Sequence, residues 1–180
     1  MGAIGSVQPL ESKYKNINPG FKKDASTLDS EGYNNNCVKC ALAFEANMRG
    51  ADVEAKPFKF GYLGERDKSV RIDKAFNNAD TWNVGRNKRE LVVNEIELTL
   101  QEDWGKGSRG IIQIQSGNIK HAMNVINQNG KVIVVDAQAG KHGTVAEMLK
   151  GLPTKNVNLF RTDNLQIKDE YKDWAYRRRK

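Results

Sequence analysis

The chain is organised around residues 34–50, which read NNNCVKCALAFEANMRG. The three asparagines, Asn34 to Asn36, are good N-cap residues, and the residues from Cys37 to Arg49 are mostly helix formers. Gly50 stands where a glycine commonly ends a helix. The pattern therefore predicts a helix over 37–49 whose first turn carries Cys37.

A cysteine in the first turn of a helix is placed where a thiolate is stabilised. The N–H groups there have no helical acceptor, and the helix dipole favours a negative charge. Such a position lowers a cysteine pKa from about 8.5 toward neutrality. Taken alone, Cys37 is more often an inert structural thiol, so a nucleophilic role requires partners elsewhere in the chain.

Length and composition favour one globular domain with a polar surface. The chain has 180 residues, 38% of them hydrophobic, and no apolar run approaches the roughly 18 residues that cross a bilayer. No signal peptide is visible at the N-terminus. We expect an extended lead-in over 1–30, a catalytic domain over 31–167 and a charged tail over 168–180.

Hydrophobic periodicity and turn residues give a coarse α+β pattern. Residues 58–86 are irregular and read as a long loop region anchored by Phe60, Tyr62, Phe76 and Trp82. The remaining pattern predicts helices over 37–49, 88–103 and 144–150, and strands over 51–55, 111–115, 119–128, 131–138 and 157–163.

The pair Asn129-Gly130 predicts a type I′ hairpin and also fixes its register. Paired positions then sum to 259, so that His121 faces Gln138 and Met123 faces Asp136. These four side chains share one face, and diagonal neighbours lie about 7–8 Å apart at the backbone. A carboxylate and an imidazole bridge that distance, so the register predicts that Asp136 orients His121.

An oriented histidine and a cysteine at a helix start are the parts needed for nucleophilic acyl transfer. In this interpretation Cys37 is the nucleophile, His121 the base and Asp136 the residue that orients it. The backbone N–H of Cys37, helped by an asparagine amide such as that of Asn35 or Asn36, stabilises the oxyanion. Gln138 binds substrate or supports His121.

Six short motifs along the chain resemble the papain-fold toxin domains of bacterial polymorphic toxins and phage-head-like proteins. The resemblance spans roughly residues 17–166, whereas 58–86 show no match. The motifs, in chain order, are Asn36-Cys37-x-x-Cys40, Arg-Gly-x-x-Val-Glu-Ala (49–55), Gly110-Ile-Ile, His121-Ala-x-Asn124-Val, Val-Asp136-Ala-Gln138-x-Gly140 and Phe160-Arg-x-Asp163-Asn-Leu.

This resemblance implies a papain-like α+β fold, in which the helix with the nucleophile packs on a small antiparallel sheet. It implies a Cys-His-Asp hydrolase without a cofactor or metal, made in a bacterium and delivered as an effector to the cytosol of a target cell. The substrate would be a protein there, and a cognate immunity protein would be a second partner. We expect glutamine deamidation; peptide cleavage by the same triad is the alternative.

Two other functions compete with the hydrolase. Cys37, Cys40, His121 and His142 could supply four zinc ligands, although the two histidines are 142 − 121 = 21 residues apart, unlike a zinc finger. The net charge of +7 raises the question of a nucleic-acid-binding module. Its basic residues are interspersed with acids and lack an aromatic stripe, and the run 177–180 reads as a solvated tail, which argues against that module.

Overall fold

The computed structural model describes residues 10–21, 32–62 and 64–180. None of the helices in these ranges is long and apolar enough to cross a membrane. The helices are α1 (Leu10–Tyr14), α3 (Cys37–Met48), α4 (Glu65–Val70), α5 (Arg89–Leu98), α6 (Val145–Leu149) and α7 (Asp169–Ala175), with a 3₁₀ turn η1 (Ile72–Ala75) and a π-helical turn η2 (Thr99–Trp104). The strands are β1 (Val53–Ala55), β2 (Thr81–Asn83), β3 (Arg109–Ser116), β4 (Ile119–Gln128), β5 (Lys131–Asp136), β6 (Lys141–Gly143), β7 (Val157–Arg161) and β8 (Tyr176–Arg178).

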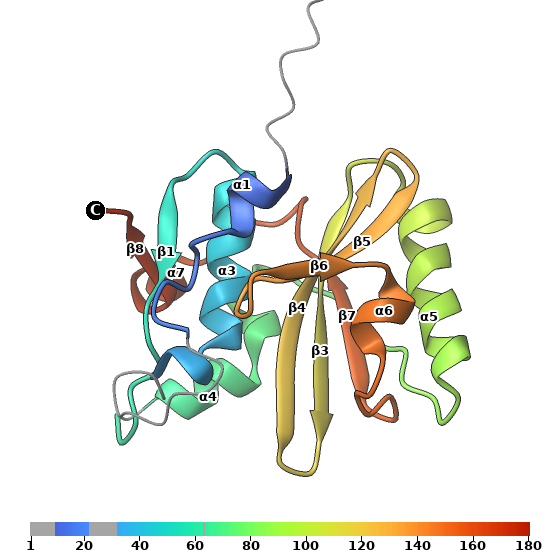
Figure 1. Ribbon diagram of the computed structural model, residues 1–180, viewed down its shortest axis with the longest axis horizontal. Coiled ribbons are helices and arrows are strands. Elements are labelled where there is room, and N and C mark those ends of the chain that lie inside the picture. Colours follow the sequence, from blue (N-terminus) through green and yellow to red (C-terminus); the bar gives the residue numbers. More distant parts are fainter. Residues whose placement is uncertain (1–9, 22–31, 63) are drawn as a thin grey trace, which may run out of the picture.

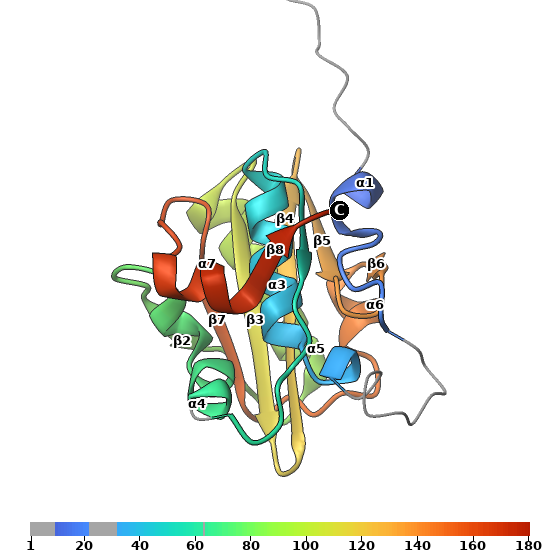
Figure 2. The same cartoon turned by 90° about the vertical axis from the view of Figure 1, so that its left-hand side faces the viewer.

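The strands form two antiparallel sheets. Six of them lie in the order β2-β7-β3-β4-β5-β6, and β1 pairs with β8 in a separate two-stranded sheet. Helix α3 lies on one side of the large sheet, with α5 and α6 on the other (Figure 1). The view in Figure 2 shows the same layering, with α3 between the large sheet and the β1–β8 pair. This arrangement confirms the predicted α+β class and the packing of the Cys37 helix on an antiparallel sheet.

Helix α3 matches its prediction to within one residue. Gly50 adopts a positive φ of 95°, and its N–H donates to the carbonyl of Asn47 at 3.1 Å. Every side chain from Val38 to Asn47 is buried. A helix buried on all sides must be covered on more than one face, and here both the large sheet and the segments around β1 and α7 cover it.

The central strands are apolar on both faces because helices cover both sides of the sheet. In β5, Val132 and Val134 pack in the cluster that includes α5 and α6. Ile133 and Val135 pack on the opposite face, with α3. A strand buried in this way reads as a continuous apolar run, which is what residues 131–136 show.

The β4–β5 hairpin has the predicted turn and register. Asn129 and Gly130 both have positive φ, 55° and 92°, as a type I′ turn requires. Gln128 pairs with Lys131 and Asn124 with Val135, which is the expected register. Strand β5 ends at Asp136, two residues earlier than predicted, because the chain turns there into β6.

The helix predicted over 88–103 is present but changes character at its end. α5 is α-helical to Leu98, and the next turn, η2, is π-helical. Of the predicted apolar stripe Val93, Ile96, Leu100 and Trp104, Ile96 and Leu100 are fully buried and the other two partly buried. Val92 is also fully buried, whereas Leu91 and Leu98 are exposed. The short helix predicted after Thr144 is also present, with the Thr144 hydroxyl accepting a hydrogen bond from the N–H of Glu147.

The interpretation of residues 58–86 as a loop region was wrong. This segment contains α4, η1 and β2, each of six residues or fewer. Elements this short do not fill the window in which a periodic pattern becomes visible. Of the expected anchors only Phe76 is buried; Phe60, Tyr62 and Trp82 are exposed by 53%, 67% and 47%.

The lead-in expected over 1–30 is not extended where the structure describes it. Residues 1–9 and 22–31 lie outside the described ranges. Between them, Leu10–Tyr14 is helical, and Tyr14 and Ile17 are buried in the core cluster that holds one face of α3. Two isolated apolar residues carry no periodic signal, so the sequence pattern missed this contribution to the core.

The charged tail expected over 168–180 is instead part of the folded unit. Tyr171 and Ala175 of α7 are buried, and β8 pairs with β1. The basic run is also partly neutralised, because Arg177 pairs with Glu54 at 2.8 Å and Arg179 with Asp52 at 3.4 Å. Because most residues of this segment are charged, its few buried apolar positions give no recognisable pattern in the sequence.

Replacing Tyr171 tests whether the C-terminal segment stabilises the domain. Tyr171 is 5% exposed, so Tyr171→Ala should lower the free energy of unfolding by about 3 kcal/mol through the cavity it leaves. Urea titration followed by circular dichroism measures this loss. Arg178→Ala, an exposed change in the same segment, should stay within about 0.5 kcal/mol of the wild type. Equal stabilities for both variants would contradict the packing of α7.

Candidate active site

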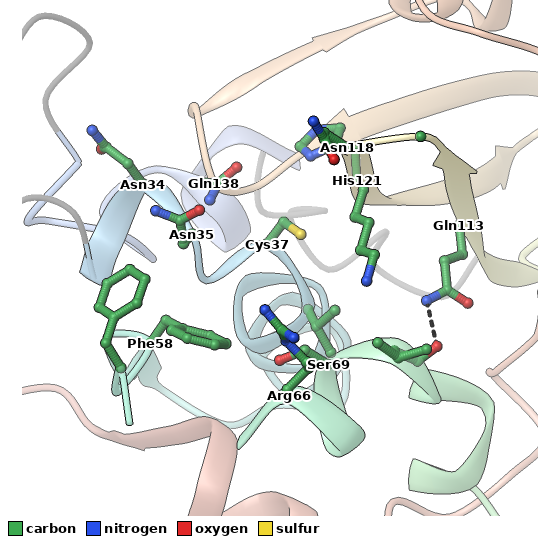
Figure 3. Close-up of a pocket in the computed structure, with 15 residues that line it drawn as sticks. Asn34, Asn35, Cys37, Phe58, Arg66, Ser69, Gln113, Asn118, His121 and Gln138 are labelled. Atoms are coloured by element: carbon green, nitrogen blue, oxygen red, sulfur yellow. Dashed lines mark hydrogen bonds between the residues drawn. The ribbon is translucent and has the colours of Figure 1, made fainter. Parts of the chain in front are cut away.

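Cys37 is the first residue of α3, and its side chain faces a pocket (Figure 3). Because it lies in the first turn, its backbone N–H has no acceptor one turn back in the helix. The thiol is partly exposed, so a small molecule or a protruding side chain can reach it from the pocket. The position expected for a nucleophile is therefore also an accessible one.

Cys40 lies one turn further along the same helix and has a different environment. Its side chain is fully buried, and its thiol donates a hydrogen bond to Oδ1 of Asn36 at 3.4 Å. Burial raises the pKa of the Cys40 thiol well above its usual value. Cys40 is therefore a core residue that packs like a small hydrophobic side chain.

The hairpin brings His121 and Asp136 together, as its register predicts. The distance between Nε2 of His121 and Oδ2 of Asp136 is 2.8 Å. The other carboxylate oxygen of Asp136 accepts a hydrogen bond from the N–H of Ala139 at 3.2 Å. Met123, expected on the same face, lies in the core cluster under α5 and does not line the pocket.

The protonated form of His121 is strongly favoured. Burial alone would lower its pKa, but hydrogen bonds with Asp136 and Cys37, and the charges of both groups, raise the pKa from 6.5 to about 10. Since Asp136 occupies Nε2, Nδ1 is the ring nitrogen left for Cys37. The structure thus places Cys37 next to the ring of His121, which Asp136 binds through Nε2.

Asn35 and Asn36, the two asparagines directly before Cys37, lie in different environments. Asn35 lines the pocket and its side chain lies beside Cys37 in Figure 3. Asn36 is buried, donates to Oδ1 of Asn18 at 2.9 Å and to the carbonyl of Lys56 at 3.0 Å, and makes no side-chain cap on α3. The expectation of a conventional asparagine cap is therefore wrong at Asn36, which instead ties the helix start to neighbouring segments.

Gln138 lies between the asparagines and the histidine strand. It lines the pocket, and its side-chain amide is 3.4 Å from Oδ1 of Asn36. Its carbonyl accepts a hydrogen bond from the side chain of Asn18 at 3.1 Å. The residue predicted to support the site is therefore present in it, and it links the Asp136 loop to the network below Cys37.

The pocket in front of Cys37 has a volume of about 450 Å³ and three walls. The first is the segment from Asn34 to Val38, and the second is the tip of the β3–β4 hairpin with His121. The third wall comes from the region after β1, where the sequence pattern predicts a loop. Its lining residues are Phe58, Phe60, Arg66, Ser69 and Val70.

The sequence predicts that the segment 58–86 borders the site together with the hairpin ends and the loop over 140–143; the segment does line the pocket, but the loop does not. His142 of that loop instead bonds through Nδ1 to the hydroxyl of Tyr14. The individual lining residues of this segment were not predicted, and the cluster Phe58-x-Phe60-x-Tyr62 was the one signal that could have pointed to them. Three aromatic residues within five positions, next to Gly61, mark a surface loop more than a core strand.

The four residues of the zinc alternative do not meet. Cys40 is bonded to Asn36, and His142 contacts Tyr14. Within residues 10–21, 32–62 and 64–180, no group of three or more histidine, cysteine, aspartate or glutamate side chains is arranged to hold a metal ion. The geometry therefore gives no support to a zinc site built from Cys37, Cys40, His121 and His142.

The two cysteines should differ sharply in reactivity. At about pH 6, iodoacetamide should label Cys37 much faster than Cys40, because Cys37 is accessible and lies next to the protonated ring of His121, whereas Cys40 is buried with a raised pKa. Peptide mapping by mass spectrometry separates the two sites. The Cys37→Ala variant should react only slowly. Similar labelling rates at both cysteines would refute the assignment of Cys37 as the activated thiol.

The raised pKa of His121 has a consequence for stability. Its protonation stabilises the fold fully below about pH 6.5, and this contribution is lost as the pH rises through about 10. Asp136→Asn removes one cause of the raised pKa. The gap in unfolding free energy between wild type and Asp136→Asn should therefore be largest near pH 6.5 and shrink toward pH 10.

Urea titrations at several pH values measure this gap. Asp103→Asn, an exposed aspartate outside the pocket, is the matched control and should show no such trend. A gap for Asp136→Asn that stays constant from pH 6.5 to pH 10 would show that the His121–Asp136 bond does not couple protonation to folding.

Comparison with known proteins identifies the family. The model of the family described as papain fold toxin 1, glutamine deamidase, matches residues 35–141, which is more than half of the chain. The match includes all six predicted site residues, from Asn35 to Gln138, and stops before α6. No curated protein and no solved structure matches the chain significantly. The helix packed on an antiparallel sheet agrees with the papain-like fold, and the chain belongs to the papain fold toxin 1, glutamine deamidase family.

Proposed function

We propose that this chain is a cysteine-dependent deamidase that converts glutamine side chains of a target-cell protein to glutamate. The observation that carries the proposal is the chain of contacts from Cys37 through His121 to Asp136 at the wall of an open pocket. The family description supports the reaction. The roles of the individual residues follow from their geometry and chemistry.

Cys37 is the nucleophile in this mechanism. Its thiolate attacks the side-chain amide carbon of glutamine, and a tetrahedral intermediate forms. His121, protonated because of its raised pKa, donates its proton to the nitrogen that leaves as ammonia. A thioester between Cys37 and the substrate remains. Asp136 keeps the ring oriented and balances its positive charge during this step.

Water completes the reaction. After ammonia has left, His121 is neutral and takes a proton from a water molecule, which attacks the thioester carbon. The C–S bond breaks, the thiolate of Cys37 is restored, and the product is glutamate. The overall balance is one water consumed and one ammonia released for each glutamine.

The intermediates carry a negative oxygen that needs hydrogen-bond donors. The backbone N–H of Cys37 is one, because it lies at the start of α3. Asn35 is the better placed of the two predicted side-chain donors, since it lines the pocket while the amide of Asn36 is committed to Asn18 and Lys56. Gln138 supports the site by holding Asn36 in place.

The toxin family also supports the biological setting proposed for the chain. A protein substrate, delivery as an effector from a bacterium into a target cell and a cognate immunity protein are all consistent with a toxin domain. The family description favours deamidation, but a peptidase would use the same triad. The test must therefore distinguish loss of ammonia from cleavage of a backbone.

Mass spectrometry of a protein extract incubated with the purified chain tests the reaction. We expect released ammonia and peptides heavier by about one dalton at glutamine positions, as hydrolysis of the amide requires. Cys37→Ala and His121→Ala should reduce the rate by about a thousandfold or more. Asp136→Asn should lose about a hundredfold or more yet keep measurable activity, because it orients the histidine without transferring the proton.

Cys40→Ala is the matched control for the loss of a thiol. It removes a buried cysteine from the same helix, so it should keep the activity even if the protein becomes less stable. Full activity in Cys37→Ala would refute the proposed nucleophile. New N-termini without a gain of one dalton would replace the deamidase with a peptidase while leaving the triad in place.

A further inference from the structure

The charged residues that line the pocket around Cys37 are all basic. Two of its lining residues are basic, Arg66 from α4 and Lys120 from β4. Among the described residues that line it, none is aspartate or glutamate. The proposed catalytic centre adds the protonated ring of His121. A substrate entering this pocket therefore meets positive charge on both sides of the thiol.

Arg66 and Lys120 are exposed and make no ion pair with any described residue. This sets Arg66 apart from most arginines of the protein. The arginines that pair with carboxylates are Arg49, Arg71, Arg109, Arg161, Arg177 and Arg179. A cation that lines a pocket without a partner is available for a carboxylate of a ligand.

Glu65, the residue before Arg66, anchors the start of α4. Glu65 is buried and contacts Nζ of Lys39 at 2.5 Å and Nε1 of Trp174 at 2.6 Å. Burial opposes ionisation of Glu65, but these bonds and the N–H of Lys59 outweigh it and lower its pKa. The start of α4 is thereby fixed to α3 and α7. Arg66 therefore extends from an anchored helix into the pocket wall. The charge of Lys39, by contrast, is paired with Glu65 inside the protein.

The two cations approach the thiol from different walls. Figure 3 shows Arg66 on one side of Cys37 and Asn118, at the tip of the β3–β4 hairpin, on the other. Lys120 belongs to that hairpin. Phe58 and Phe60, on the same wall as Arg66, form an apolar surface, with their rings 5.0 Å apart. A chain segment that crosses the pocket therefore passes a cation before and after its central residue.

Resting on the proposed function, we propose that the site selects glutamines flanked by acidic residues, whose carboxylates pair with Arg66 and Lys120. Arginine binds a carboxylate through two parallel hydrogen bonds, and lysine adds a point charge. Complementary charge also speeds the encounter of the two proteins. A basic segment next to the glutamine is repelled by the same two residues.

Synthetic peptides that differ only in the flanks of one glutamine test this preference. A peptide with glutamate flanks should show a kcat/KM about tenfold above that of its alanine analogue, and one with lysine flanks should be slower, since each exposed pair contributes a severalfold effect. The differences in kcat/KM among the three peptides should vanish or reverse in the double variant Arg66→Glu/Lys120→Glu. It should also weaken in about 1 M salt, where the Debye length is about 3 Å.

A second measurement does not depend on deamidation. Iodoacetate is anionic and iodoacetamide neutral, and both alkylate Cys37. The ratio of their rates should fall by about tenfold in Arg66→Glu/Lys120→Glu if the two cations attract a carboxylate to the thiol. Arg178→Glu reverses an exposed arginine of β8 that has no ion pair among the described residues and does not line the pocket, so it should keep the wild-type ratio.

The two measurements separate the possible failures. An unchanged alkylation ratio in the double variant, or equal rates on acidic and neutral peptides, would overturn the preference for acidic flanks. If none of the peptides released ammonia but the alkylation ratio fell as expected, the proposed deamidation would be in doubt while the attraction of carboxylates to the thiol would stand.

Discussion

The position of helix α3 on the sheet depends on one buried carboxylate. Glu45 is fully buried, and its two oxygens accept hydrogen bonds from Nη2 and Nε of Arg109 on β3, at 2.9 and 3.0 Å. Arg49 adds a third bond to Glu45 and donates to the carbonyl of Thr162. A buried charge is costly unless its partners have good geometry, so these bonds permit little rotation or sliding of the helix.

Because Glu45 and Cys37 lie on the same helix, the bonds to Glu45 also limit the position of Cys37. Cys37 lies eight residues before Glu45, about 12 Å along the helix. Near the middle of the helix, Asn124 of β4 donates to the carbonyl of Ala41 at 3.0 Å. His121 is three residues from Asn124 on the same strand. The same strand that holds the helix therefore also carries the histidine, which is how Cys37 and His121 come within hydrogen-bond reach.

The proposed chemistry uses opposite environments for two cysteines on one helix. Cys37 lies at an open pocket next to a ring that is held protonated, whereas Cys40 is sealed in the core with its pKa raised. One helical turn is enough to separate an accessible thiol from a buried one. Arg66 adds positive charge at the pocket wall. It follows Glu65, which the buried contacts with Lys39 and Trp174 anchor. The core thus supports both the nucleophile and the charge of the pocket.

The sequence by itself determined the local geometry: the helix that begins at Cys37, the hairpin at Asn129-Gly130 and, through its register, the pairing of His121 with Asp136. Each follows from short-range rules of capping, turn conformation and side-chain alternation. Only the tertiary structure decided which distant segments complete the domain and the pocket. The wall with Phe58 and Arg66, the burial of Tyr14 and the packing of α7 depend on short elements with few apolar residues. Such elements are stabilised by the surfaces they contact and not by a pattern of their own, so no stretch of sequence reveals them alone.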